Sequence, residues 1–68
     1  MEEARLYYNE NGIHDTLCLI GGNDSISEIT INENGTMNVK FIRSTKVGDG
    51  EWVDVEHNYK GITKISFK

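Results

Sequence analysis

The chain has one cysteine, no proline and no long apolar run. A single cysteine excludes a disulfide within the chain, and with no evident signal peptide it favours a reducing cytoplasm as the location. The longest apolar run, Leu17-Cys18-Leu19-Ile20, is far shorter than the ~20 residues that cross a bilayer, so we expect no membrane partner. Because proline is absent, no strand edge is blocked by it.

The length also sets limits. We expect a single domain over residues 1–68, and domains of this size bury only ~60% of their unfolded surface. To be stable, such domains commonly need a disulfide, a bound metal or a partner chain. Since no disulfide can form, a homodimer through a strand edge or the face of Trp52 is one hypothesis. Catalytic pockets of ~300–1,000 Å³ are hard to build from so few side chains, so we expect no enzyme.

The net charge of −4 is unevenly placed. Residues 1–36 carry seven acids against one arginine, which gives −6, and residues 37–68 carry six bases against four acids, which gives +2. Such asymmetry between halves marks either a charged interaction surface or a requirement for solubility.

Alternation of apolar and polar residues dominates the chain, and glycine-containing turns divide it into short segments. The predicted strands are residues 4–9, 13–20, 26–32, 36–46, 51–58 and 62–68. The sequence therefore predicts an all-β domain, a small antiparallel meander of five to six strands that closes as a two-layer sandwich or a small barrel.

Hairpin registers follow from aligning the apolar residues, because a slip of one residue moves every side chain to the other face. The predicted registers oppose Leu6 to Leu17, Ile31 to Met37, Glu28 to Lys40, Phe41 to His57, Thr45 to Val53, Val55 to Ile65 and Glu56 to Lys64. One face then collects Ile29, Ile31, Met37, Val39, Phe41, Val53, Val55, Ile65 and Phe67, and the first hairpin covers it. Arg43 also points inward, which indicates a bulge near residues 42–44 or a strand that has left the core.

Groups that could carry catalysis or bind metal are few. His14 and Cys18 share a strand face about two repeats apart, each repeat spanning ~7 Å, which is too far for direct proton transfer. Neither His14 with Asp15 and Cys18 nor the segment 54–57 has the spacing of a zinc site. No glycine pattern makes a phosphate loop. We therefore expect no catalytic residue, no metal and no cofactor.

Trp52 is the main binding candidate. In the predicted registers it points away from the core, between Lys46 and Lys68 on the neighbouring strands, with Ile42 two rows away. Two interpretations stay open: Trp52 covers the second face of the sheet between lysine stems, or it anchors a partner, as tryptophan does in many interfaces. The candidate binding residues are Trp52, Lys46, Lys68, Ile42, Lys40 and Lys64.

The functional hypothesis is a small non-catalytic protein that acts by contact with a larger protein. An inhibitor of a host enzyme, of the kind that a phage or mobile element encodes, is one form of it. The alternative is a β-module that binds single-stranded nucleic acid or another anion through lysines around Trp52, by aromatic stacking on a basic face. The net negative charge favours the first hypothesis, because it repels an anion.

Overall fold

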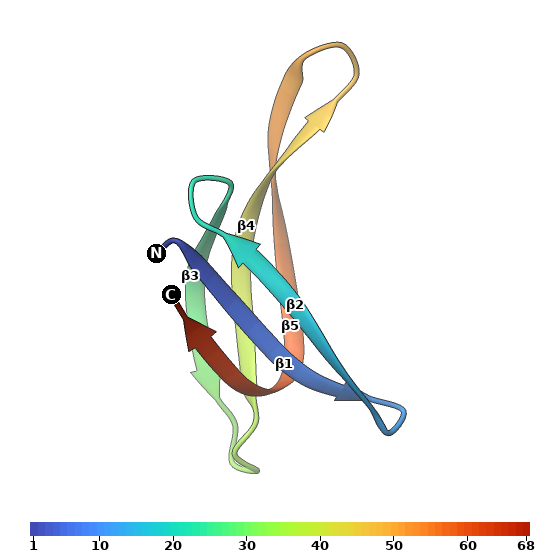
Figure 1. Ribbon diagram of the computed structural model, residues 1–68, viewed down its shortest axis with the longest axis vertical. Helices are drawn as coiled ribbons and strands as arrows, with labels where there is room; N and C mark the ends of the chain where they lie inside the picture. The colour runs from blue at the N-terminus through green and yellow to red at the C-terminus, as the bar shows by residue number, and fades with distance from the viewer.

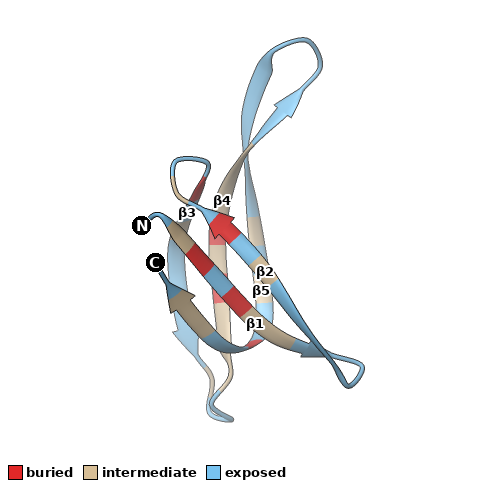
Figure 2. Cartoon of the chain, in the orientation of Figure 1, coloured by how far each residue is buried: buried red, intermediate tan, exposed pale blue.

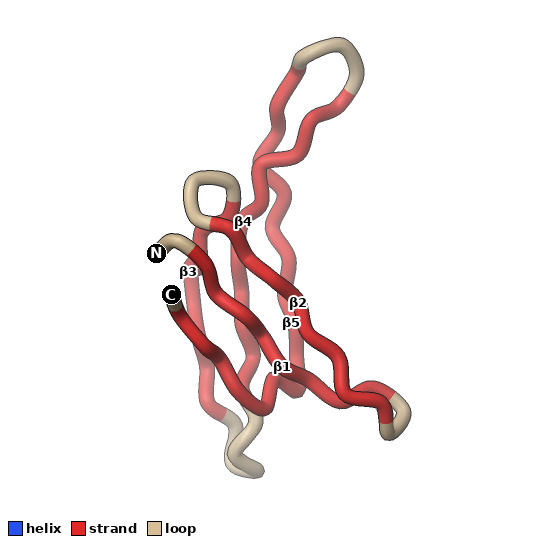
Figure 3. Tube along the Cα trace, in the orientation of Figure 1, coloured by secondary structure: helices blue, strands red, loops and turns tan.

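Five antiparallel strands make up the computed structural model, which describes residues 1–68 (Figures 1 and 3). They are β1 (Glu3–Glu10), β2 (Ile13–Ile20), β3 (Asp24–Ile31), β4 (Met37–Val47) and β5 (Glu51–Phe67). They form one sheet in the order β2-β1-β5-β4-β3. The prediction of a small all-β antiparallel meander is confirmed, and the sheet stays open rather than closing into a barrel. The structure contains no helix that could cross a membrane.

The registers of three predicted hairpins are confirmed. Leu6 lies opposite Leu17, Ile31 opposite Met37, and Phe41 opposite His57. In the first hairpin both turn residues have positive φ, 51° at Asn11 and 79° at Gly12. A two-residue turn of this kind matches the right-handed twist of the strands that it joins. Local turn chemistry and apolar alignment therefore select the same pairing.

The predicted turn at residues 59–61 is wrong, and with it the pairings of Val55 with Ile65 and of Glu56 with Lys64. β5 runs through this region as one bent strand that pairs first with β4 and then with β1. The register shifts on both sides of the bend, and Gly61 has a φ of 73°. A glycine in this conformation serves a bulge as readily as a turn. Ile65 consequently pairs with Leu6.

The bend brings β1 and β2 across the face of β4 and forms a small core (Figure 2). We call the side of the sheet that carries this core the inner face. Its fully buried apolar residues are Ala4, Leu6, Leu19, Val39, Phe41 and Ile62. The predicted core was wrong in several members, because Ile29, Ile31, Val53, Val55 and Phe67 are exposed. Ile62, placed in no predicted core position, is buried because it lies at the bend between β4 and β1.

Arg43 ends the core on β4. Its Nε donates to Asp24 Oδ1 at 2.7 Å, and its guanidinium lies 5.4 Å from the centre of the Phe41 ring. Asp24 is buried, and its other carboxylate oxygen accepts a hydrogen bond from the Ile20 amide at 2.8 Å. Of the two alternatives for Arg43, the bulge near residues 42–44 is absent, and β4 leaves the core directly after Arg43.

Beyond Arg43 the β4–β5 hairpin projects from the body of the molecule (Figure 1). We call residues 44–54 the arm. Its strands are paired through Val47 and Glu51, and its loop has positive φ at Gly48 and Gly50. The arm gives the molecule its elongated shape of 42 × 25 × 20 Å.

Candidate functional site: the surface from the β3 edge to Trp52

Trp52 lies on the outer face of the arm, where 62% of its surface is exposed. The register places it directly opposite Lys46, as predicted. Ser44 and Asp54 form the next pair along the same face, and Ile42 with Glu56 the pair after that. The Ser44 hydroxyl donates to the Asp54 carboxylate at 3.0 Å. The structure therefore brings together Trp52, Lys46 and Ile42 on one face.

The other candidate lysines lie elsewhere. Lys40 is six residues from Lys46 along β4, about 20 Å at the usual strand rise, and its Nζ lies 3.6 Å from Glu28. Lys64 pairs with Tyr7 on the far half of the sheet, with its Nζ 5.3 Å from the ring centre. The backbone of Lys68 pairs with Glu3. Lys68 is not beside Trp52, because the hairpin that would have placed it there is not formed.

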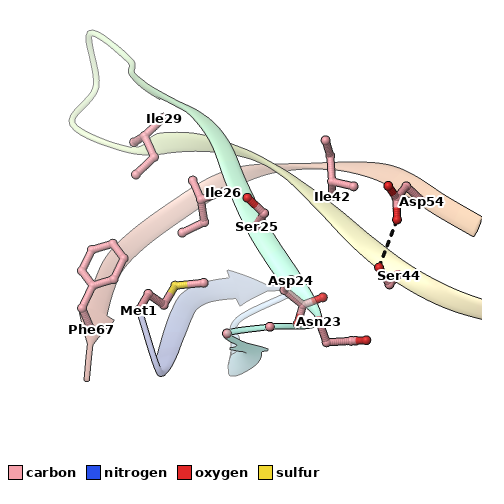
Figure 4. Close-up of a pocket in the computed structure, with 12 residues that line it drawn as sticks. Met1, Asn23, Asp24, Ser25, Ile26, Ile29, Ile42, Ser44, Asp54 and Phe67 are labelled. Carbon is pink, nitrogen blue, oxygen red and sulfur yellow. Dashed lines mark hydrogen bonds between the residues drawn. The ribbon is translucent and has the colours of Figure 1, made fainter.

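A depression of about 570 Å³ follows the free edge of β3 (Figure 4). Its apolar lining is Met1, Ile26, Ile29, Ile42 and Phe67. On its polar side it reaches the Ser44–Asp54 pair, which adjoins the pair of Lys46 and Trp52. Trp52 thus adjoins the polar side of the depression, and we call the depression together with Trp52 the contact surface.

A bulge shapes this surface. The pairing of β3 with β4 shifts between Ile26 and Glu28, so that Ser27 is the extra residue. Ile26 and Ile29 consequently both lie on the inner side of the strand and both line the depression. Bulges commonly re-aim a side chain in this way. Sequence reasoning missed the depression, although the spacing of three between the two isoleucines breaks the period of two and is a readable signal.

No family model, no curated protein and no solved structure matches this chain.

The edge of β3 carries little protection against pairing. Lysine, proline and inward charges are the usual devices that keep an edge strand from adding another strand. β3 has neither lysine nor proline, and its two charged residues are both engaged: Asp24 with Arg43 and Glu28 with Lys40. A β-bulge is a further device of this kind, and β3 has one at Ser27.

The groups considered for catalysis lie apart from the contact surface. The Cys18 thiol on β2 donates to the Glu3 carboxylate at 3.0 Å. This hydrogen bond, with a smaller effect of burial, raises the pKa of the thiol above its ordinary value. A raised pKa lowers the thiolate fraction, and the thiolate is the reactive form. No three side chains of histidine, cysteine, aspartate or glutamate converge as they would around a metal ion.

Proposed function

We propose that this chain is a non-catalytic protein that acts by binding a larger protein through the contact surface. The observation that carries the proposal is the exposed Trp52 close to a partly apolar depression, along a strand edge whose one protection is the bulge at Ser27. Tryptophan is enriched among the residues that dominate binding energy, and contiguous exposed apolar surface is typical of interaction sites.

The occupant of the depression is an extended segment of the partner. The free side of β3 offers backbone N–H and C=O groups to an added strand. Side chains that alternate along such a segment would enter the depression between Ile26 and Ile29, which already lie on one side. The neighbouring Trp52 then supplies the large apolar contact.

The role that we propose for this contact is inhibition of a larger enzyme, of the kind that phages and mobile elements encode. Its support is the small size of the domain. The single cysteine supports a cytoplasmic location. The nucleic-acid alternative depended on four lysines around Trp52, and only Lys46 lies beside it.

The test uses the immobilised protein and an extract of its native cells. The wild type retains a partner in stoichiometric amount, and Trp52→Ala weakens the purified complex by about 30-fold or more, as expected for a residue worth ~2 kcal/mol. The control is Ile13→Ala at the β1–β2 turn, since Ile13 is 70% exposed and lies outside the contact surface. Ile13→Ala should bind like the wild type.

Two results contradict the proposal. One is a partner that Trp52→Ala and the wild type retain equally. The other is binding of labelled single-stranded DNA at low salt that Trp52→Ala abolishes, which would establish the alternative function.

A further inference from the structure

The arm exposes apolar side chains on both of its faces. Trp52 lies on the outer face with 62% of its surface exposed. Val47 and Val53 lie on the inner face and are 41% and 40% exposed. The pairs Lys46–Trp52 and Thr45–Val53 follow each other along the two strands, so adjacent residues point to opposite sides. A flat partner that covers Trp52 leaves the valines in water, whereas a cleft covers both faces.

The arm has only two strands and no layer packed against it. The pairing of β3 with β4 ends at Arg43, and β1 pairs with β5 only from Ile62 onward. At the base of the arm, the Ser44 amide donates a hydrogen bond to the Asn23 carbonyl. Two-stranded hairpins without a packed face are at best marginally stable in water. Contact with a partner on both faces therefore supplies the packing that the chain itself does not give to the arm.

The arm is also acidic. Its three acids, Asp49, Glu51 and Asp54, stand against one base, Lys46, which gives a charge of −2. None of these four side chains forms an ion pair within the chain. Because complementary charges favour association and like charges oppose it, the arm favours a basic partner surface over a second copy of itself.

We propose that the arm inserts into a cleft of the larger protein, with apolar walls against Trp52 on one side and Val53 on the other, and with basic side chains around the acidic tip. This inference rests on the proposed function and adds to it the shape and the charge of the partner. The Ser44–Asp54 pair belongs both to the arm and to the depression, so the depression lies at the mouth of the cleft. An arm seated in this way excludes a substrate from the cleft, as an inhibitor of an enzyme must.

The test measures which faces of the arm are covered in the complex with the partner purified from the native extract. In a Cys18→Ser background, Thr45→Cys places a thiol on the inner face and Lys46→Cys places one on the outer face. Ile13→Cys, at the β1–β2 turn, is the control. With the partner at about 10 times its dissociation constant, only about one molecule in eleven is free, so a maleimide should label both arm variants about tenfold more slowly than in the free protein. The labelling of Ile13→Cys should not change.

Binding measurements on the same complex test the walls and the charge. Val53→Lys places an unpaired charge against an apolar wall and should weaken the complex by about 30-fold or more. Ile13→Lys makes the same charge change outside the arm and should bind like the wild type. Asp49→Asn combined with Glu51→Gln should slow association by about 10-fold at low salt, and this difference should disappear at high salt.

The outcomes separate this inference from the proposed function. If Trp52→Ala weakens the complex while Thr45→Cys stays as reactive as Ile13→Cys, the partner covers one face only, and insertion alone is overturned. If the wild type retains no partner, both proposals are overturned. Protection of Thr45→Cys in the protein without its partner means that a second copy covers the inner face, which also overturns insertion. An association rate that ignores the charge of the tip overturns the basic cleft.

Discussion

Replacing Asp24 by alanine removes the acceptor at the start of β3 that joins it to the end of β2 and to Arg43 on β4. Its carboxylate accepts from Arg43 Nε at 2.7 Å, from Arg43 Nη2 at 3.3 Å and from the Ile20 amide at 2.8 Å. Removing one partner of a fully buried ion pair costs about 3–5 kcal/mol. The Arg43 side chain is 32% exposed, so water replaces part of the lost interaction. We therefore expect a loss of about 2–3 kcal/mol in the free energy of unfolding.

That loss is a large share of the stability of such a domain. At the usual 0.05–0.15 kcal/mol per residue, a chain of this length has roughly 3–10 kcal/mol in total. The melting temperature should fall by roughly 10–20 °C in Asp24→Ala. Thermal unfolding followed by circular dichroism measures it, with the protein concentration held constant because oligomerisation shifts the midpoint.

The pH dependence of stability provides an independent readout of the same interaction. Burial opposes ionisation of Asp24, but the hydrogen bonds from Arg43 and the Ile20 amide overcome it, so its pKa lies below the ordinary 3.8. The unfolded chain therefore binds the proton more readily than the native one. The stabilisation is present above pH 3.8 and is lost as the pH falls through the lowered native pKa of Asp24. Asp24→Asn should abolish this part of the loss of stability at low pH.

Asp54→Ala is the matched control for Asp24→Ala, because Asp54 is exposed and accepts one hydrogen bond, from Ser44. We expect it to change the stability by no more than about 0.5 kcal/mol. If Asp24→Ala melted like the wild type, or no lower than Asp54→Ala, the role assigned to the buried pair would be refuted.

Two further substitutions test the core and the thiol. Ile62→Ala should lower the free energy of unfolding by about 2–5 kcal/mol and Ile31→Ala should leave it almost unchanged, because only Ile62 is buried. Equal melting temperatures of the two variants would contradict this assignment of the core. Glu3→Gln removes the carboxylate that raises the pKa of the Cys18 thiol, so iodoacetamide should alkylate Cys18 faster at pH 8, and an unchanged rate would contradict that cause.

The hairpin registers were predictable because two local signals agree at each of them. Around Asn11-Gly12 and Asn34-Gly35, turn residues that tolerate positive φ flank strands whose apolar residues align in only one register. The same alternation placed Trp52 outward and opposite Lys46. Within a single hairpin, the face that each side chain takes depends on nearby residues, so it can be predicted from the sequence.

The remaining features depend on contacts between distant residues. Gly61 permits either a turn or a bend, and the choice depends on whether the last strand finds β4 or β1. Neither Asp24 nor Arg43 reveals its partner locally, since 19 residues separate them. Alternation placed Val53 and Val55 on the inner face of the sheet, as the structure does, but it does not show where the body of the molecule ends, and both side chains are exposed.

The two edge strands, β2 and β3, are neighbours in the chain, so the sheet becomes continuous only when β1 meets β5. During synthesis β1 and β2 leave the ribosome well before β5, the strand that joins them to the rest. Leu6 and Leu19 must remain exposed to solvent, or bound by a chaperone, until residues 62–67 have emerged from the ribosome. Such long-range closure predicts slow folding for a chain so short, and a vulnerable interval on the ribosome before β5 is made.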